Sequence, residues 1–340
     1  MTTNHTRTFR VSLDAMGGDF GPSETVPAAI NAVAAEGLEV LLVGDPREIQ
    51  AEIIRHSAED LPLKIIPSKD VIRDDESPLL ALRSKPKAST VIGVGMVKEG
   101  MADAFVTMGS TGAAMAASAF GLGLMNGIDR PALGGPIYGL AENTVLIELG
   151  SSIDCNPTKL LNFAALGVAF ARTYLETENP RVALLSVGSE ANKGNKQVKE
   201  SFPIFQKSGL NFIGNVEGQD VVLDTADVIV CDGFVGNILL KAFEGIGDTL
   251  AKYMKQRLSG LLSDTDVSSV SQDVYDLLNR TEHTGGGPLF GIKGNVVVGH
   301  GRARASAIAG AIATAKRLGE LSLTARMQEE LAALHVSVPA

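Results

Sequence analysis

The feature that most constrains the fold is a regular alternation of short aliphatic runs with longer stretches of helical spacing. The runs are rich in Val, Leu and Ile and carry no polar alternation, which is typical of strands buried on both faces of a parallel sheet. The stretches between them repeat apolar residues at helical spacing, as at Leu160, Phe163, Ala164 and Gly167. This alternation predicts a multilayer α/β fold with a mostly parallel sheet. The predicted strands are residues 9–13, 40–43, 63–66, 104–107, 145–149, 182–187, 228–230 and 296–298.

No linker, low-complexity tract or internal repeat interrupts this alternation, and 340 residues are enough to bury a sizeable core. We therefore expect one compact α/β domain over residues 8–320 rather than two independent domains. A helical insertion is expected at about 248–283 and a C-terminal helical tail at 321–340.

Charge and cysteine content exclude several classes of protein. Lys and Arg number 30 against 39 Asp and Glu, so the net charge of −9 gives no general attraction for nucleic acid. Cys155 and Cys231 lie far apart and outside any C-x-x-C pattern, which argues against a zinc site or a disulfide framework. The polar N-terminus lacks the apolar core of a signal peptide, and the apolar stretch 113–125 is shorter than the roughly 20 residues that span a bilayer. We expect a soluble, cytoplasmic protein.

Small polar turns follow most of the predicted strands. Ligands bind beyond the carboxyl ends of the strands in open parallel sheets, so these turns are predicted to line one crevice. Glycine alone is explained by tight turns, as at 44–46, but turns do not require the Asp, Asn, Ser and His that accompany it. The turns are residues 14–19, 44–46, 108–112, 150–154, 188–190, 232–237 and 299–301.

The first turn, 14–19, is a candidate anion-binding loop. Its paired glycines allow backbone N–H groups to approach an anion, and a helix expected to begin near residues 23–25 presents its N-terminus to negative charge. The turn is neither a Walker motif nor a G-x-G-x-x-G motif.

Each candidate side chain also has a structural alternative. Ser110 or Thr111 either holds an anion or caps the alanine-rich helix that follows. Lys193 either neutralises phosphate or a developing oxyanion, or is an ordinary solvated lysine. Asn237 either donates its amide to a substrate carbonyl or caps a helix. The candidate catalytic residues are Lys193 and Asn237, and the candidate phosphate- and substrate-binding residues are Asp14, Gly17, Gly18, Asp19, Gly109, Ser110, Thr111, Gly112, Asn195, Asp232 and His300.

The sequence gives no support for a metal, a cofactor or a covalent nucleophile. The histidines form no metal-ligand spacing with one another or with carboxylates. No G-x-S-x-G elbow is present, and neither cysteine has a base nearby in sequence. Direct attack by a bound substrate is the simpler expectation.

Taken in order, the turns resemble the motifs of one known family. Their order and spacing, over about residues 11–313, resemble the bacterial phosphate:acyl-carrier-protein acyltransferases, the PlsX family. The motifs are LDAMGGD (13–19), KPKAS (85–89), STGA (110–113), RPA (130–132), KGN (193–195), GNVEG (214–218), CDGFVGN (231–237) and HG (300–301).

The resemblance implies that a fatty acyl group passes from acyl carrier protein (ACP) to inorganic phosphate, giving acyl phosphate for phospholipid synthesis. It also implies a homodimer and a three-layer Rossmann-like fold similar to phosphotransacetylases and isocitrate dehydrogenase-like proteins. Lys193 and Asn237 match the family positions that handle phosphate and the acyl carbonyl. Our hypothesis is that the turns at 17–18 and 109–112, with Lys193, orient phosphate, while Asn237 with Lys193 stabilises the oxyanion.

The family also associates peripherally with the inner face of the cell membrane through an apolar helical tip. The matching stripe here is Leu250, Met254, Leu258, Leu261 and Leu262, beside basic residues at 252, 255 and 257. Such a basic amphipathic helix either lies on anionic lipid or packs in the core or a dimer interface.

Three turns differ from the usual family pattern. Ser110 replaces an Asn, Ser151 and Ser152 replace Ala-Asn, and Ser189 replaces a Glu. The serine hydroxyls can still donate hydrogen bonds.

Alternatives left open are an acyl-CoA-dependent phosphate acyltransferase and a divergent regulator that binds ACP or lipid. An NAD-dependent dehydrogenase of related fold is disfavoured, because no G-x-G-x-x-G or metal-binding Asp set is visible.

Overall fold

The computed structural model of the chain describes residues 7–136, 139–279 and 285–334. Its contacts divide the chain into two compact units. The first unit is Met1–Leu124 with Thr284–Thr324, and the second is Met125–His283 with Ala325–Ala340. We predicted a single domain over residues 8–320, whereas the contacts within the chain form two compact units. That residues 8–320 fold together as one domain stays a prediction.

The first unit is built on strands in the order β3-β2-β1-β4-β11-β10. Neighbouring strands are parallel except for the β10–β11 pair. The register pairs Val11 with Val40 and with Ala104, so the three central strands end at the same edge. The strands are β1 (Arg10–Asp14), β2 (Glu39–Gly44), β3 (Leu63–Pro67), β4 (Ala104–Thr107), β10 (Gly287–Phe290) and β11 (Val296–Val298).

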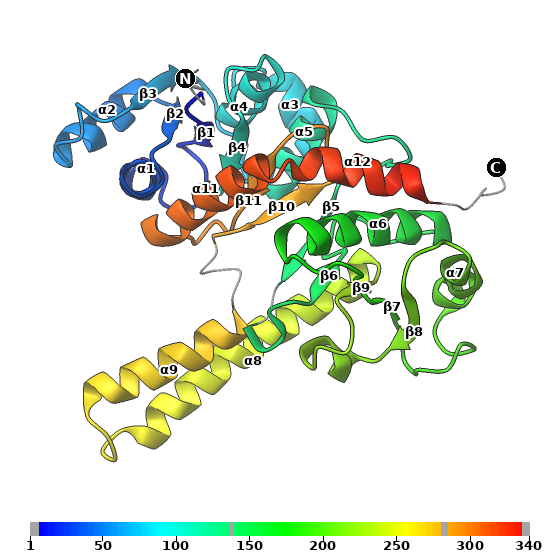
Figure 1. The fold of residues 1–340 in the computed structure, drawn as a ribbon. Helices are drawn as coiled ribbons and strands as arrows, with labels where there is room; N and C mark the ends of the chain where they lie inside the picture. The colour runs from blue at the N-terminus through cyan, green and yellow to red at the C-terminus, as the bar shows by residue number, and fades with distance from the viewer. Residues whose placement is uncertain (1–6, 137–138, 280–284, 335–340) are drawn as a thin grey trace, which may run out of the picture. The chain divides into compact units, whose positions relative to one another are not determined.

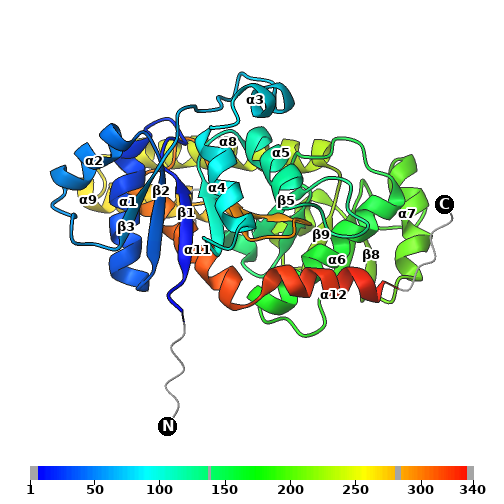
Figure 2. The same ribbon diagram turned by 90° about the horizontal axis from the view of Figure 1, so that it is seen from above.

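Helices pack on both faces of these strands. Figures 1 and 2 show α4 and α5 on one face and α1 and α11 on the other, which gives the three layers of a Rossmann-like fold. The helices are α1 (Pro22–Glu36), α2 (Pro46–Arg55), α3 (Pro78–Ser84), α4 (Ser89–Lys98), α5 (Thr111–Gly121) and α11 (Ala305–Glu320). The next helix, α12 (Leu323–Ala333), belongs to the second unit from Ala325 onward.

The second unit repeats the same plan. Its strands run in the order β5-β6-β9-β7-β8, and only the β5–β6 pair is antiparallel. Short 3₁₀ helices lie at Gly139–Ala141 and Gly218–Val222. The main elements are β5 (Ala132–Pro136), β6 (Val145–Ile147), β7 (Val182–Leu185), β8 (Phe212–Val216), β9 (Val228–Val230), α6 (Pro157–Tyr174), α7 (Lys196–Gln206), α8 (Gly233–Leu258) and α9 (Asp264–Leu278).

The predicted helical insertion is a hairpin of α8 and α9, which run side by side (Figure 1). Its first helix starts well before residue 248, because α8 begins at Gly233, so residues 233–237 of the expected turn are the first part of this helix. Among the described residues, no helix is both long enough and apolar enough to cross a membrane.

The predicted strands are all present. Most are apolar runs buried on both faces, but the edge strand β3 has no fully buried residue and contains the exposed Lys64. The strands β4, β7 and β9 are fully buried along their length. Three strands were missed: β5, β8 and β10. Their sequences ALGGP, FIGNV and GPLF contain glycine, proline or asparagine, which weaken the strand signal.

Candidate active site

The turn after β1 is organised around the buried carboxylate of Asp14, which is 1% exposed. Its Oδ2 accepts hydrogen bonds from the hydroxyls of Thr90 (3.0 Å) and Thr107 (2.9 Å). The Thr107 hydroxyl in turn accepts from the Gly109 backbone N–H at 2.9 Å. Asp14 therefore ties the turn at 14–19 to the turn at 108–112, and its carboxylate is engaged within the protein.

Burial raises the pKa of Asp14, against hydrogen bonds from neighbouring hydroxyls that act to lower it. The two turns are in direct contact at Gly17, where a Cβ atom would lie 2.8 Å from the backbone nitrogen of Gly109. Only glycine fits there. Gly18 adopts a positive φ of 83°, which also favours glycine.

The turn after β11 joins the same group. The backbone N–H of Asp19 donates to the Gly301 carbonyl at 2.8 Å, and that of Gly299 donates to the Thr107 carbonyl at 2.9 Å. His300 lies between these contacts and is half-buried. The turns at 14–19, 108–112 and 299–301 thus lie together, as expected for the carboxyl ends of the neighbouring strands β1, β4 and β11.

Three candidate binding residues are helix N-caps. Ser110 accepts from the Ala113 N–H at the start of α5. Asn195 and Asp232 do the same at the starts of α7 and α8, each with a 2.9 Å hydrogen bond. The capping alternative therefore holds for Ser110, and contact of these three residues with a substrate stays a prediction.

Asn237 is not a cap, because Asp232 occupies that position on α8. Asn237 lies one turn further along the helix, and its side chain is exposed. Among the described residues no hydrogen bond to its amide is recorded, which leaves the amide available to a ligand.

Lys193 is exposed in the loop between β7 and α7. Its backbone N–H donates to the Glu190 carbonyl at 2.9 Å. Its side chain crosses Gly188, where a Cβ atom would lie 2.8 Å from Lys193 Cγ. The glycine turn therefore leaves room for the lysine stem, and the ammonium group is open to an anion.

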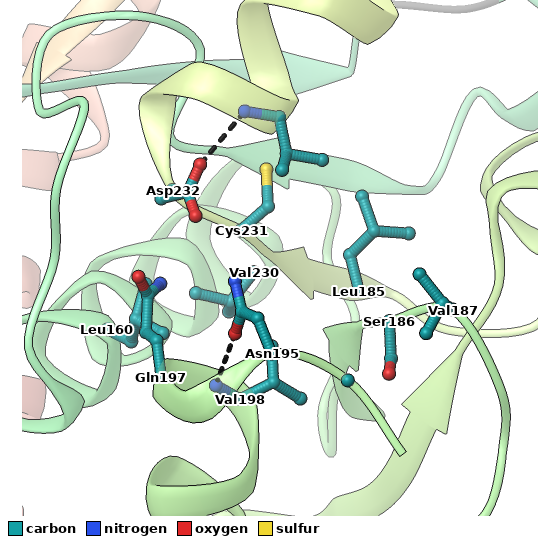
Figure 3. Close-up of a pocket in the computed structure, with 12 residues that line it drawn as sticks. Leu160, Leu185, Ser186, Val187, Asn195, Gln197, Val198, Val230, Cys231 and Asp232 are labelled. Carbon is teal, nitrogen blue, oxygen red and sulfur yellow. Dashed lines mark hydrogen bonds between the residues drawn. The ribbon is translucent and has the colours of Figure 1, made fainter.

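A cavity of about 130 Å³ lies in the second unit, at the carboxyl ends of β7 and β9 (Figure 3). The N-termini of α7 and α8 border it through Asn195 and Asp232. The Ser186 hydroxyl also lines it, and among the described residues this buried oxygen has no hydrogen-bond partner. The other lining residues are Leu160, Leu185, Val187, Gly194, Gln197, Val198, Val230, Cys231 and Val235.

The cysteines are not activated nucleophiles. Burial, followed by the nearby charge of Glu148, raises the pKa of Cys155 to about 12. Burial also raises the pKa of Cys231. A raised pKa disfavours the thiolate, which is the reactive form of cysteine. In the described ranges, no group of three or more His, Cys, Asp or Glu residues is placed to hold a metal ion.

Comparison with known proteins identifies the family. A family model described as fatty acid synthesis protein matches residues 9–326. The chain belongs to this family. It is 43% identical over 309 residues to a phosphate acyltransferase of Desulforudis audaxviator, covering 90% of this chain and 91% of that one. A phosphate acyltransferase of Trichodesmium erythraeum is 39% identical over 327 residues, covering 94% and 96%. These matches confirm the resemblance, and the protein is an acyltransferase.

Proteins with little sequence identity to this chain share its fold. A branched-chain phosphotransacylase from Enterococcus faecalis superposes with a TM-score of 0.58 at 14% identity, covering 92% of this chain and 99% of that one. A phosphotransacetylase from Streptococcus pyogenes gives 0.57 at 16% identity, covering 95% and 94%. The predicted Rossmann-like class, similar to phosphotransacetylases, is confirmed.

Proposed function

We propose that the protein transfers a fatty acyl group from acyl-ACP to inorganic phosphate, giving acyl phosphate for the synthesis of phosphatidic acid and phospholipids. The observation that carries the proposal is the similarity, over nearly the whole chain, to proteins named phosphate acyltransferase. A phosphate oxygen attacks the thioester carbonyl, a C–O bond forms, and the C–S bond breaks as the thiolate leaves and takes up a proton.

This reaction needs little general-base catalysis. Phosphate is anionic near neutral pH and a thiol is a good leaving group, so orientation and stabilisation of the oxyanion account for most of the rate. The exposed amide of Asn237 is suited to the acyl oxyanion, and the exposed Lys193 ammonium to the charge of phosphate or of that oxyanion. The glycine turns at 17–18 and 109–112 are proposed to contribute backbone N–H donors to phosphate.

The roles of Lys193 and Asn237 are tested by the Lys193→Ala and Asn237→Ala variants. Loss of one oxyanion donor typically lowers kcat by about 10²–10³-fold, and we expect a loss in this range for each variant. Lys207→Ala is the matched control, because this exposed lysine lies at the far end of α7. Near-normal turnover in both site variants would refute the assignment.

The acyl donor is tested by phosphate-dependent release of thiol from acyl-ACP and from acyl-CoA at equal concentrations. We expect a higher kcat/KM with acyl-ACP. A preference for acyl-CoA would overturn the choice of donor and leave the transfer to phosphate intact. Binding of acyl-ACP without phosphate-dependent release would instead favour a regulator.

We also propose that the protein is cytoplasmic and binds peripherally to the inner face of the cell membrane through the tip of the α8–α9 hairpin. Leu261 is 76% exposed, and Leu262 and Tyr253 are 46% and 55% exposed. Lys252, Lys255 and Arg257 are exposed on the same stretch. Apolar side chains beside basic ones suit an anionic lipid surface.

Flotation with anionic and with zwitterionic vesicles tests this association. We expect binding to the anionic vesicles only, and its loss in a Leu261→Ser, Leu262→Ser double variant. No flotation with anionic vesicles would eliminate the proposal.

A homodimer is proposed from the family resemblance, and light scattering should then give twice the chain mass of 35.5 kDa.

A further inference from the structure

Glu148 is a buried acid that the sequence motifs do not single out. It directly follows β6 and is 0% exposed. Its Oε1 accepts from the backbone N–H groups of Gly150 (2.8 Å) and Ser151 (2.7 Å). Its Oε2 accepts from the Ser151 hydroxyl, which also lies 2.6 Å from the Pro131 carbonyl. Both oxygens of the carboxylate are therefore engaged by the turn at 150–152.

No cation accompanies this carboxylate in the ion pairs of the described residues. A buried carboxylate without a cation is unfavourable unless hydrogen bonds compensate it, and here those bonds come almost entirely from the following turn. The carboxylate and the conformation of the turn are thus mutually dependent. Without the acid, two buried N–H groups lose their acceptor.

The turn at 150–152 forms the surface on which the start of α8 rests. The backbone N–H of Gly233, the first residue of α8, donates to the Ser152 carbonyl at 2.8 Å. A Cβ atom at Gly236 would lie 2.0 Å from the Glu148 carbonyl oxygen. The first turn of α8 therefore packs directly against the backbone of residues 148–152.

The same turn contacts Asn237. A Cβ atom at Gly150 would lie 3.5 Å from both Cβ and Oδ1 of Asn237. Gly150 has a φ of 144°, a backbone conformation that favours glycine. Because no hydrogen bond to the Asn237 amide is recorded among the described residues, its place depends on packing against Gly150 and on the position of α8.

We propose that Glu148 is a positioning residue of the active site: its carboxylate sets the 150–152 turn, and through that turn the place of the Asn237 amide. The proposal rests on the proposed role of Asn237 at the acyl carbonyl. Glu148 itself does not touch substrate. Displacing a catalytic group by about 1 Å lowers the rate by up to about 10²-fold, which sets the expected size of the effect.

The test is a double-mutant cycle with kcat and KM as readouts. Glu148→Ala is expected to lower kcat by about 10–100-fold, with little change in the KM for acyl-ACP or the KM for phosphate. Glu148→Gln retains an acceptor for the two N–H groups and is expected to keep kcat within about threefold. In the Asn237→Ala background, Glu148→Ala is expected to cause no further loss, because it acts through Asn237.

Asp227→Ala is the matched control for stability. Asp227 is a carboxylate of the same unit that accepts from the Arg181 backbone N–H at 2.6 Å and from its guanidinium. It precedes β9, at the opposite end of that strand from α8. We expect this variant to lower the melting temperature and leave kcat unchanged.

The outcomes separate this inference from the proposed function. Normal kcat in Asn237→Ala refutes the role of Asn237. If kcat falls in Asn237→Ala but stays normal in Glu148→Ala, only the positioning role is refuted. The positioning role is also refuted if Glu148→Ala lowers kcat by the same factor in the wild type and in the Asn237→Ala variant. A Gln variant as impaired as the Ala variant also overturns it. If Glu148→Ala does not fold, Glu148→Asp, which withdraws the carboxylate by one methylene, replaces it in the cycle with the same expectations.

Discussion

At the ends of the strands, a sequence pattern does not distinguish a polar side chain that caps a helix from one that binds a ligand. Ser110, Asn195 and Asp232 stand out because they are polar residues in glycine turns, and each caps the following helix. A cap and a ligand-binding residue require the same residue types at the same place. Asp14 is similar, because its position in the turn was predicted but its use as a buried hydrogen-bond acceptor was not.

The pH dependence of stability tests the environment of Asp14. Its pKa is raised in the folded protein, so its contribution to stability is full below its unfolded pKa of about 3.9 and is lost as pH rises through the folded value. The neutral Asp14→Asn variant does not undergo this loss. We therefore expect the free energy of unfolding of the wild type, minus that of the variant, to decrease as pH rises.

Urea unfolding of both proteins from pH 4 to pH 8 measures this difference. A difference that stays constant, or that increases with pH, would contradict the raised pKa. Asp227→Asn is a useful comparison, because partial burial acts to raise the pKa of Asp227 but its hydrogen bonds with Arg181 outweigh it and the pKa is lowered. Because its pKa is lowered, its difference is expected to stay nearly constant from pH 4 to pH 8 and to fall only as pH drops below the unfolded value of about 3.9.

At the scale of elements, the parallel core was predictable and its irregular parts were not. Largely aliphatic runs identify β1, β4, β7 and β9, because burial on both faces leaves few polar positions. The strand β5, with the sequence ALGGP, lacks that signal and is held instead by antiparallel pairing with β6. The contact of α8 with the 148–152 turn depends on residues about 80 positions apart, as the hydrogen bond from Gly233 to Ser152 illustrates.

The packing of α8 on this turn is tested by comparing substitutions at two of its glycines. A Cβ atom at Gly236 would lie 2.0 Å from the Glu148 carbonyl oxygen, whereas nothing lies within 4 Å of a Cβ atom at Gly245. We expect Gly236→Ala to lower the free energy of unfolding by about 1–3 kcal/mol through overpacking. Gly245→Ala is expected to raise it by up to about 1 kcal/mol through better helix propensity. Equal effects in chemical denaturation would show that α8 does not pack on this turn.

At the scale of the whole molecule, the ordered set of turns specified the family where no single turn did. The resemblance rested on motifs spread over residues 11–313, and the family match extends over 9–326. Composition alone excluded only nucleic-acid binding and secreted, disulfide-rich classes. The role of Glu148 was not predictable, because the sequence placed it inside the predicted strand 145–149, whereas β6 ends at Ile147 and the carboxylate accepts from the turn that follows.

The most direct test of the central claim is to follow the oxygen atoms of phosphate. The protein is incubated with acyl-ACP and ¹⁸O-labelled inorganic phosphate, and the products are identified by mass spectrometry. If phosphate attacks the thioester, acyl phosphate forms with every labelled oxygen retained, and free ACP thiol appears in equal amount. Release of unlabelled fatty acid without acyl phosphate, or thiol release independent of phosphate, would contradict the account.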